Sequence, residues 1–203
     1  MKKALTIGEL LITMAIIGVI ATLVLPGFLK DYHKKVYITR LKKVVESVEN
    51  AVNQACIDNN VSYFDQTTYS KASDGSNQQA FIDKYFKKVT VGNNQKPFSE
   101  KYFSVSGTSG AANLVAEHGY GKLASGEAVS MYCGGSVNYC IFRVDVNSTD
   151  GPNIGGRDMF MLGIDKKTNK IYEAHANLAD CTADPLGKGC FGMLLRDNWE
   201  MTY

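Results

Sequence analysis

The hydrophobic pattern of the chain begins with a long apolar run near the N-terminus. Residues 10–29 carry no charged side chain, and Thr13 and Thr22 supply the only polar side chains among them. An α-helix rises ~1.5 Å per residue, so a run of this length is enough to cross the ~30 Å hydrocarbon layer of a bilayer. The run therefore predicts a helix that spans a membrane or forms the core of an assembly.

A second pattern follows directly after this run. Apolar residues recur at spacings of three and four, which places them in one stripe along a helix. They are Tyr37, Leu41, Val44, Val45, Val48, Val52, Ala55 and Cys56. The pattern predicts that one helix runs from Leu5 to about Ile57, and that its amphipathic second half packs against a domain.

The middle of the chain has weaker signals. Residues 66–79 are polar and rich in turn-forming side chains, which predicts a surface loop with little core. Residues 81–91 fit a short amphipathic helix. Residues 104–126 are rich in Gly, Ser and Ala, and predict an irregular connection with a short strand or two.

Strand signals are clearest in the last third of the chain. In residues 140–147 the apolar side chains alternate with Arg143 and Asp145, which is the period of a half-buried strand. Residues 159–164 and 170–173 flank a polar segment and predict a hairpin. The expected fold is therefore α+β, with a long N-terminal helix packed on a small antiparallel sheet.

Composition favours an exported, membrane-anchored protein over a cytosolic enzyme. The formal net charge is +2 and the Lys and Arg residues are scattered, so nothing points to nucleic acid as a partner. Five cysteines are a high count for a reducing compartment, and export would allow them to pair. We expect residues 5–29 to form the apolar helix and residues 30–203 to form one soluble domain.

One ionisable side chain, Glu9, lies between Lys3 and Lys30. A carboxylate at the edge of an apolar helix is costly in lipid, and such residues usually have a partner and a function. No Lys or Arg lies within one or two helical turns of Glu9 on its membrane side. Its partner is therefore expected to come from elsewhere.

The residues around this glutamate resemble a known processing signal. A short basic leader ending at Ala4, a hydrophobic start at Leu5, Glu9 as the fifth residue from that point, and Pro26 further along match the prepilin-type signal of type IV pilins and type II secretion pseudopilins. The chain departs from this family in having Ala4 where Gly is usual and Gly8 where an aliphatic residue is usual. The glutamate and the proline are both retained.

The resemblance implies a function, a location and partners. Residues 1–4 would be a leader that prepilin peptidase removes between Ala4 and Leu5, and Leu5 would then be N-methylated. The subunit would wait in the inner membrane as a single-pass protein with a cytoplasmic N-terminus, and an inner-membrane assembly platform would lift it from the lipid bilayer into a periplasmic or extracellular filament. Glu9 would pair with the freed α-amino group of a neighbouring subunit's Leu5. The resemblance also implies a pilin-like fold and homo- or hetero-polymeric pilin partners.

The hydrophobic run alone permits other interpretations. A secretory signal peptide has a shorter apolar region than this one. An ordinary signal anchor fits by length, and it would make the chain a single-pass periplasmic domain that binds a ligand or performs catalysis as a monomer. Such an anchor has no reason to contain Ala4, Glu9 and Pro26 at these positions.

Motifs for enzymatic chemistry are absent from the sequence. It contains no nucleophile elbow, no phosphate-binding glycine loop and no HExxH motif. His33, His118 and His175 lie far apart without metal-ligand spacing. We expect a structural protein rather than an enzyme, with no cofactor except the calcium considered below.

The cysteines lack the CxxC spacing that is typical of zinc sites. Cys133 and Cys140 lie close enough to close a short loop, as do Cys181 and Cys190, which would leave Cys56 as a buried thiol. Five cysteines allow other connectivities. Pilins often carry a disulfide-closed loop near the C-terminus, and the Cys181–Cys190 pair resembles that arrangement.

A cluster of oxygen-bearing side chains follows the strand at residues 140–147. Asp145, Asn147, Asp150 and Asp158 could together hold calcium, because alternation places Asp145 on the wetter face of the strand. The spacing does not match an EF-hand loop. The alternative is a connecting loop in which Asp and Asn side chains cap turns.

Overall fold

The computed structural model describes residues 6–72, 74–89, 96–111, 119–135 and 137–203. Residue contacts divide the chain into two compact units, Met1–Val36 and Tyr37–Tyr203. Helix α1 (Ile7–Asp58) begins in the first unit and ends in the second. All other helices and strands among the described residues belong to the second unit.

The second unit is an α+β domain whose main sheet is antiparallel throughout. Among the described residues this sheet has six strands in the order β1-β4-β5-β6-β7-β8. Their bounds are β1 (Lys88–Val89), β4 (Gly119–Leu123), β5 (Ala128–Cys133), β6 (Tyr139–Asp145), β7 (Met159–Asp165) and β8 (Ile171–Tyr172). Strands β2 (Lys101–Phe103) and β3 (Ser109–Ala111) pair with each other in a separate hairpin.

Short helices complete the domain. They are α2 (Ser76–Tyr85), α3 (Cys190–Arg196) and three 3-10 turns at Phe64–Gln66, Thr68–Ser70 and Leu178–Thr182. Helix α2 lies directly against β4, because a Cβ atom at Gly119 would come within 2.3 Å of the carbonyl carbon of Gln78. This glycine allows the two backbones to approach closely.

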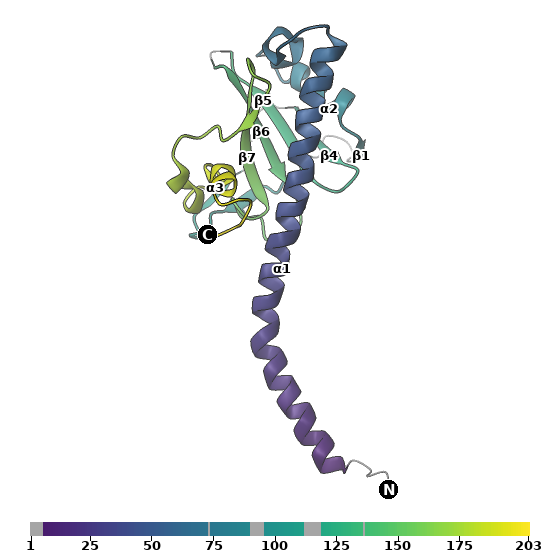
Figure 1. The fold of residues 1–203 in the computed structure, drawn as a ribbon, viewed down its shortest axis with the longest axis vertical. Coiled ribbons are helices and arrows are strands. Elements are labelled where there is room, and N and C mark those ends of the chain that lie inside the picture. Colours follow the sequence, from purple (N-terminus) through teal and green to yellow (C-terminus); the bar gives the residue numbers. More distant parts are fainter. Residues whose placement is uncertain (1–5, 73, 90–95, 112–118, 136) are drawn as a thin grey trace. The chain divides into compact units, whose positions relative to one another are not determined.

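The main core lies between the second half of α1 and one face of the sheet. The α1 residues in this core are Ile38, Leu41, Val44, Val45, Val48, Ala51, Val52, Ala55 and Cys56. They pack with strand residues such as Val129, Phe142 and Leu162, all of them fully buried. Figure 1 shows this half of α1 running across the sheet. Each fully buried Leu or Val contributes about 1.5–3 kcal/mol, so this stripe holds the helix on the domain.

A second, smaller core lies on the opposite face of the sheet. It contains Phe98, Tyr102 from β2, Ala128 from β5 and Met159 from β7. The β2–β3 hairpin is joined to the β6–β7 connection by backbone hydrogen bonds, including Phe103 N to Asn153 O at 2.9 Å. One end of this sheet face is thereby buried under the hairpin.

The structure confirms the predicted α+β fold, with a long helix and a small antiparallel sheet. Helix α1 ends within one residue of the predicted end, and β6, β7 and β8 fall in the segments that the alternation and the turn signals indicated. Strand β6 ends at Asp145, two residues before the predicted end. The β7–β8 hairpin has the predicted polar turn between Asp165 and Lys170.

Two predictions for the middle of the chain are wrong. Residues 66–79 contribute to the interior, because Gln78 is fully buried and its side-chain amide donates to the carbonyl oxygens of Tyr69 and Lys71. The helix expected over residues 81–91 lies at Ser76–Tyr85, and Lys88 and Val89 form an edge strand instead. Polar side chains concealed the first turn of α2, which is fixed by its contact with β4.

Candidate functional site

The first unit presents an apolar helix that nothing else in the described chain covers. The large apolar side chains between Ile7 and Leu29 are 49–78% exposed. None of the most apolar window of α1 is buried, and by length and composition the helix could cross a membrane, a property that a signal sequence near the N-terminus shares. A contiguous apolar surface of this size requires lipid or protein to cover it.

Thr6 and Glu9 close the N-terminus of α1 with a reciprocal capping interaction. Glu9 Oε2 accepts hydrogen bonds from Thr6 N at 2.9 Å and from Thr6 Oγ1 at 2.8 Å, while Glu9 N donates to the Thr6 hydroxyl at 3.3 Å. Within the single chain these hydrogen bonds give the carboxylate neutral partners, and the charged partner expected from elsewhere stays a prediction. The Thr-x-x-Glu spacing of a capping box is the sequence signal that predicts these bonds.

The other residues of the predicted processing signal are only partly described. Ala4 and Leu5 lie outside the described residues, so cleavage between them stays a prediction, as does the pairing of Glu9 with a neighbour's Leu5. Pro26 lies inside α1, which continues through it. Since proline has no N–H, one backbone hydrogen bond is lost within the apolar segment.

Two disulfides reinforce the second unit, and they are the two short loops that the spacing indicated. Cys133 and Cys140 join directly paired residues of β5 and β6. Cys181 and Cys190 join the turn Leu178–Thr182 to the start of α3. Cys56 is free and buried, and burial raises the pKa of its thiol.

Asp145 is buried, although the sequence predicted that it lies on the wetter face of its strand. It is fully buried, and its Oδ2 lies 2.5 Å from the Tyr102 hydroxyl, which acts as the donor. Its Oδ1 accepts from the backbone N–H of Asn147 at 3.1 Å. Burial raises the pKa of this carboxyl to about 8. The expectation of a wet face is wrong because the β2–β3 hairpin covers that side of the sheet.

Asp158 is also fully buried and organises the loop before β7. Its two oxygens accept from the backbone N–H groups of Asn153 at 2.7 Å and Ile154 at 2.6 Å. Burial raises the pKa of this carboxyl as well. The carboxylate is therefore used to shape the loop, as turn-capping Asp side chains commonly do.

The predicted calcium site is not assembled from these four residues. Asp150 is exposed, and the Asn147 amide donates to the carbonyl oxygens of Asp150 and Gly151 at 2.8 Å each. Within the part of the chain that the structure describes, no group of three or more His, Cys, Asp or Glu side chains is placed to hold a metal ion. The loop alternative accounts for the observed hydrogen bonds.

Arg40 joins α1 to the connection that follows β6. Its Nη1 donates to the carbonyl oxygen of Val146 at 3.1 Å. Nearby Tyr37 has a raised pKa, first because it is partly buried and then because Asp158 is negatively charged. No sequence signal indicates this junction, since more than a hundred residues separate the two partners and neither has a local pattern.

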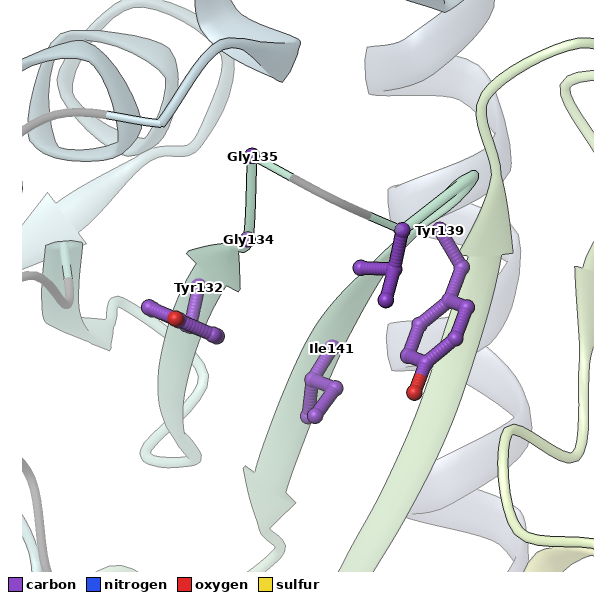
Figure 2. A pocket seen from close by; sticks show the side chains of 6 residues that line it. Tyr132, Gly134, Gly135, Tyr139 and Ile141 are labelled. Carbon is purple, nitrogen blue, oxygen red and sulfur yellow. The ribbon is translucent and has the colours of Figure 1, made fainter.

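A shallow groove lies on the sheet face opposite α1, at the end that the β2–β3 hairpin does not cover. It measures about 260 Å³ and is lined by Tyr132, Gly134, Gly135, Val137, Tyr139 and Ile141. Figure 2 shows Tyr132 on β5 and Ile141 on the neighbouring strand β6, with Tyr139 at the start of β6. These described lining residues include two tyrosines and no carboxylate, imidazole or thiol.

Lys166 binds the turn between β5 and β6, which contributes residues to this groove. Its Nζ donates to the carbonyl oxygens of Gly134 at 3.0 Å and Val137 at 2.9 Å. The side chain is almost fully buried, and burial lowers the pKa of its ammonium group. The lysine therefore has a structural role in fixing the β5–β6 turn.

The histidines form no common site among the described residues. His175 Nε2 lies 2.7 Å from Asp180 Oδ2 in the segment before α3, and His33 lies on α1 in the first unit. His118 lies outside the described residues.

Comparisons with protein-family models, curated proteins and solved structures find no match to this chain.

Proposed function

We propose that this chain is a structural subunit of a type IV pilus or of a type II secretion pseudopilus. The observation that carries the proposal is the first half of α1. Its apolar side chains are exposed on all sides, and a single carboxylate, Glu9, lies at its start. An apolar helix of this kind is stable in lipid before assembly and among copies of itself afterwards.

The second unit supports the proposal through its construction. It buries its own half of α1, carries two disulfides and thus has an interior of its own. The apolar half can then exchange lipid for protein neighbours without unfolding the domain. The resemblance of Ala4, Leu5, Glu9 and Pro26 to the prepilin signal adds processing by prepilin peptidase before assembly.

The mature N-terminus tests the proposed processing. Mass spectrometry of the protein from its native membrane should find a chain that begins at N-methylated Leu5. A chain that begins at Met1, or one cut beyond the apolar run, would contradict the proposal. A chain that begins at Met1 would favour a monomeric membrane-anchored domain. A chain cut beyond the apolar run would favour a secreted domain.

Assembly is tested by substitution within the apolar helix. Glu9→Ala should leave the subunit inserted in the membrane but should prevent normal filament formation, because it removes the carboxylate proposed to pair with the α-amino group of a neighbouring subunit's Leu5. Thr13→Val is the matched control, since Thr13 donates to the Leu10 carbonyl of its own helix at 2.9 Å. Wild-type filament levels for Glu9→Ala would show that the glutamate is not required for assembly.

A further inference from the structure

A basic segment follows the apolar run of α1 immediately. Lys30, Lys34 and Lys35 lie within six consecutive residues, with Asp31 as the one acidic side chain among them. Three lysines against one aspartate leave two net positive charges. Lys30 and Lys35 are exposed and Lys34 is partly exposed, all in the first unit.

The position of these lysines runs against the usual charge bias of membrane spans. Loops on the cytoplasmic side normally carry the excess of Lys and Arg. In the proposed function Lys2 and Lys3 leave with the leader, so the mature span keeps its lysines on the other side alone. Anionic groups at the same depth would offset this unfavourable bias.

The length of the segment matches the depth of a lipid headgroup layer. Six helical residues extend about 7.5 Å, and the headgroup region on one side of a bilayer is about 5–8 Å deep. Tyr32 is 55% exposed in the same segment, and tyrosine is enriched at this depth. Lysine side chains extend toward phosphates from such positions while their methylene groups cover apolar surface.

We propose that Lys30, Lys34 and Lys35 form a collar that binds the phosphates of anionic lipids where α1 leaves the bilayer. The inference rests on the proposed membrane-inserted state of the subunit and adds the lipid class that surrounds it. Charge complementarity and direct continuity with the apolar run favour lipid over an acidic protein surface. The collar holds the waiting subunit at a fixed depth in the bilayer.

The test uses the protein purified from its native membrane in a neutral detergent, titrated with phosphatidylglycerol or phosphatidylcholine of the same acyl chains and analysed by native mass spectrometry. The wild-type protein should retain phosphatidylglycerol preferentially. Each lysine near a headgroup layer contributes roughly fivefold, so Lys30→Gln/Lys34→Gln/Lys35→Gln should lose on the order of a hundredfold in that preference. Raising the salt concentration should weaken the wild-type preference as well.

Two further variants control for charge and for folding. Lys43→Gln/Lys167→Gln/Lys170→Gln removes the same charge from exposed lysines of the second unit and should leave the preference unchanged. Replacing the three collar lysines with Arg keeps the charge and should retain the preference. A preference that survives the collar Gln variant, or that falls equally in the control, would overturn the proposal.

The outcomes separate the lipid collar from the filament proposal. The same spectra give the mass of the chain, so processing at Leu5 is measured independently of lipid binding. Equal binding of both lipids by the wild-type protein would overturn the collar and leave the filament untouched. If that result came with a filament defect in the collar Gln variant, the lysines would contact an acidic protein surface instead.

Discussion

Residues 7–29 and residues 37–58 of α1 share one type of secondary structure and have opposite surroundings. In residues 7–29 the large apolar side chains are exposed on all sides, whereas in residues 37–58 a single stripe is buried against the sheet. Leu23 is 77% exposed and Leu41 is fully buried. The comparison shows that helical structure alone does not determine what a residue contributes. The apolar side chains of the first half are not covered within the described chain, whereas those of the second half are buried against the sheet.

The comparison is tested most directly by equal truncations in the two halves. Leu41→Ala should lower the free energy of unfolding of the second unit by about 2–5 kcal/mol, because it removes buried methyl groups and leaves a cavity. Leu23→Ala is the matched control and should leave this free energy unchanged. Denaturant unfolding in detergent, followed through the fluorescence of Trp199, measures both; this single tryptophan packs against Phe191 in the second unit. Equal losses for the two variants would contradict the division.

A second difference is that the second unit contains buried ionisable side chains such as Asp145. The folded pKa of Asp145 is about 8 against an ordinary value of 3.8. Between these values the folded chain holds a proton that the unfolded chain has lost, so stability falls as the pH rises through this window. Asp145→Asn should remove a fall on the order of 2–4 kcal/mol between pH 4 and pH 8.

The exposed Asp150 provides the control for this pH dependence. Asp150→Asn makes the same chemical change on the surface and should preserve the wild-type slope. Asp158 and Glu173 also have raised pKa values because of burial, so some of the slope should persist in Asp145→Asn. Identical pH profiles for the wild type and Asp145→Asn would show that the carboxyl is ionised in the folded state at neutral pH.

The two disulfides are a third difference, because both lie in the second unit. Replacing Cys133 and Cys140 by Ser should cost about 2–3 kcal/mol in the second unit, because an open β5–β6 loop gives the unfolded chain more freedom. The helical circular dichroism contributed by residues 7–29 in detergent should not change. A loss of that helical signal in the variant would mean that the two halves of α1 are coupled.

The smallest expected effect is at the surface of the second half of α1. Lys42 Nζ lies 5.1 Å from the centre of the Trp199 ring. Lys42→Gln should lower stability by about 0.5–1 kcal/mol and shift the Trp199 emission, because it removes a cation from the ring face. Lys43→Gln changes the neighbouring exposed lysine and should do neither. An unchanged emission in Lys42→Gln would indicate that this contact is not populated.

Local sequence patterns predicted the helices and strands that bury one face along their whole length. The three-four spacing from Leu41 to Cys56 predicted the buried stripe of α1, since one side of that helix faces the sheet throughout. Alternation predicted β6 for the same reason. Strand β5 was not predicted, because Ala128–Cys133 is buried almost throughout and so shows no alternation between apolar and polar residues.

The site predictions divide in the same way. The exposed apolar run and the short cysteine loops are properties of neighbouring residues, and spacing along the chain was enough to indicate them. Asp145 lies on the predicted side of β6, but that side is not wet, because the hairpin that covers it comes from a segment more than forty residues earlier. The capping role of Thr6 was readable from its spacing to Glu9 but was not predicted.

The sequence by itself determined the long helix, its apolar first half and amphipathic second half, the α+β class and the pairs of cysteines near enough to close short loops. These follow from periodicity and spacing, which act between residues close in the chain. Tertiary structure alone decided that Asp145 and Asp158 are buried, that Arg40 joins α1 to Val146, and that the β2–β3 hairpin covers one end of the sheet. The reason is that burial and hydrogen bonding between distant segments depend on which surfaces meet, and no local pattern records that.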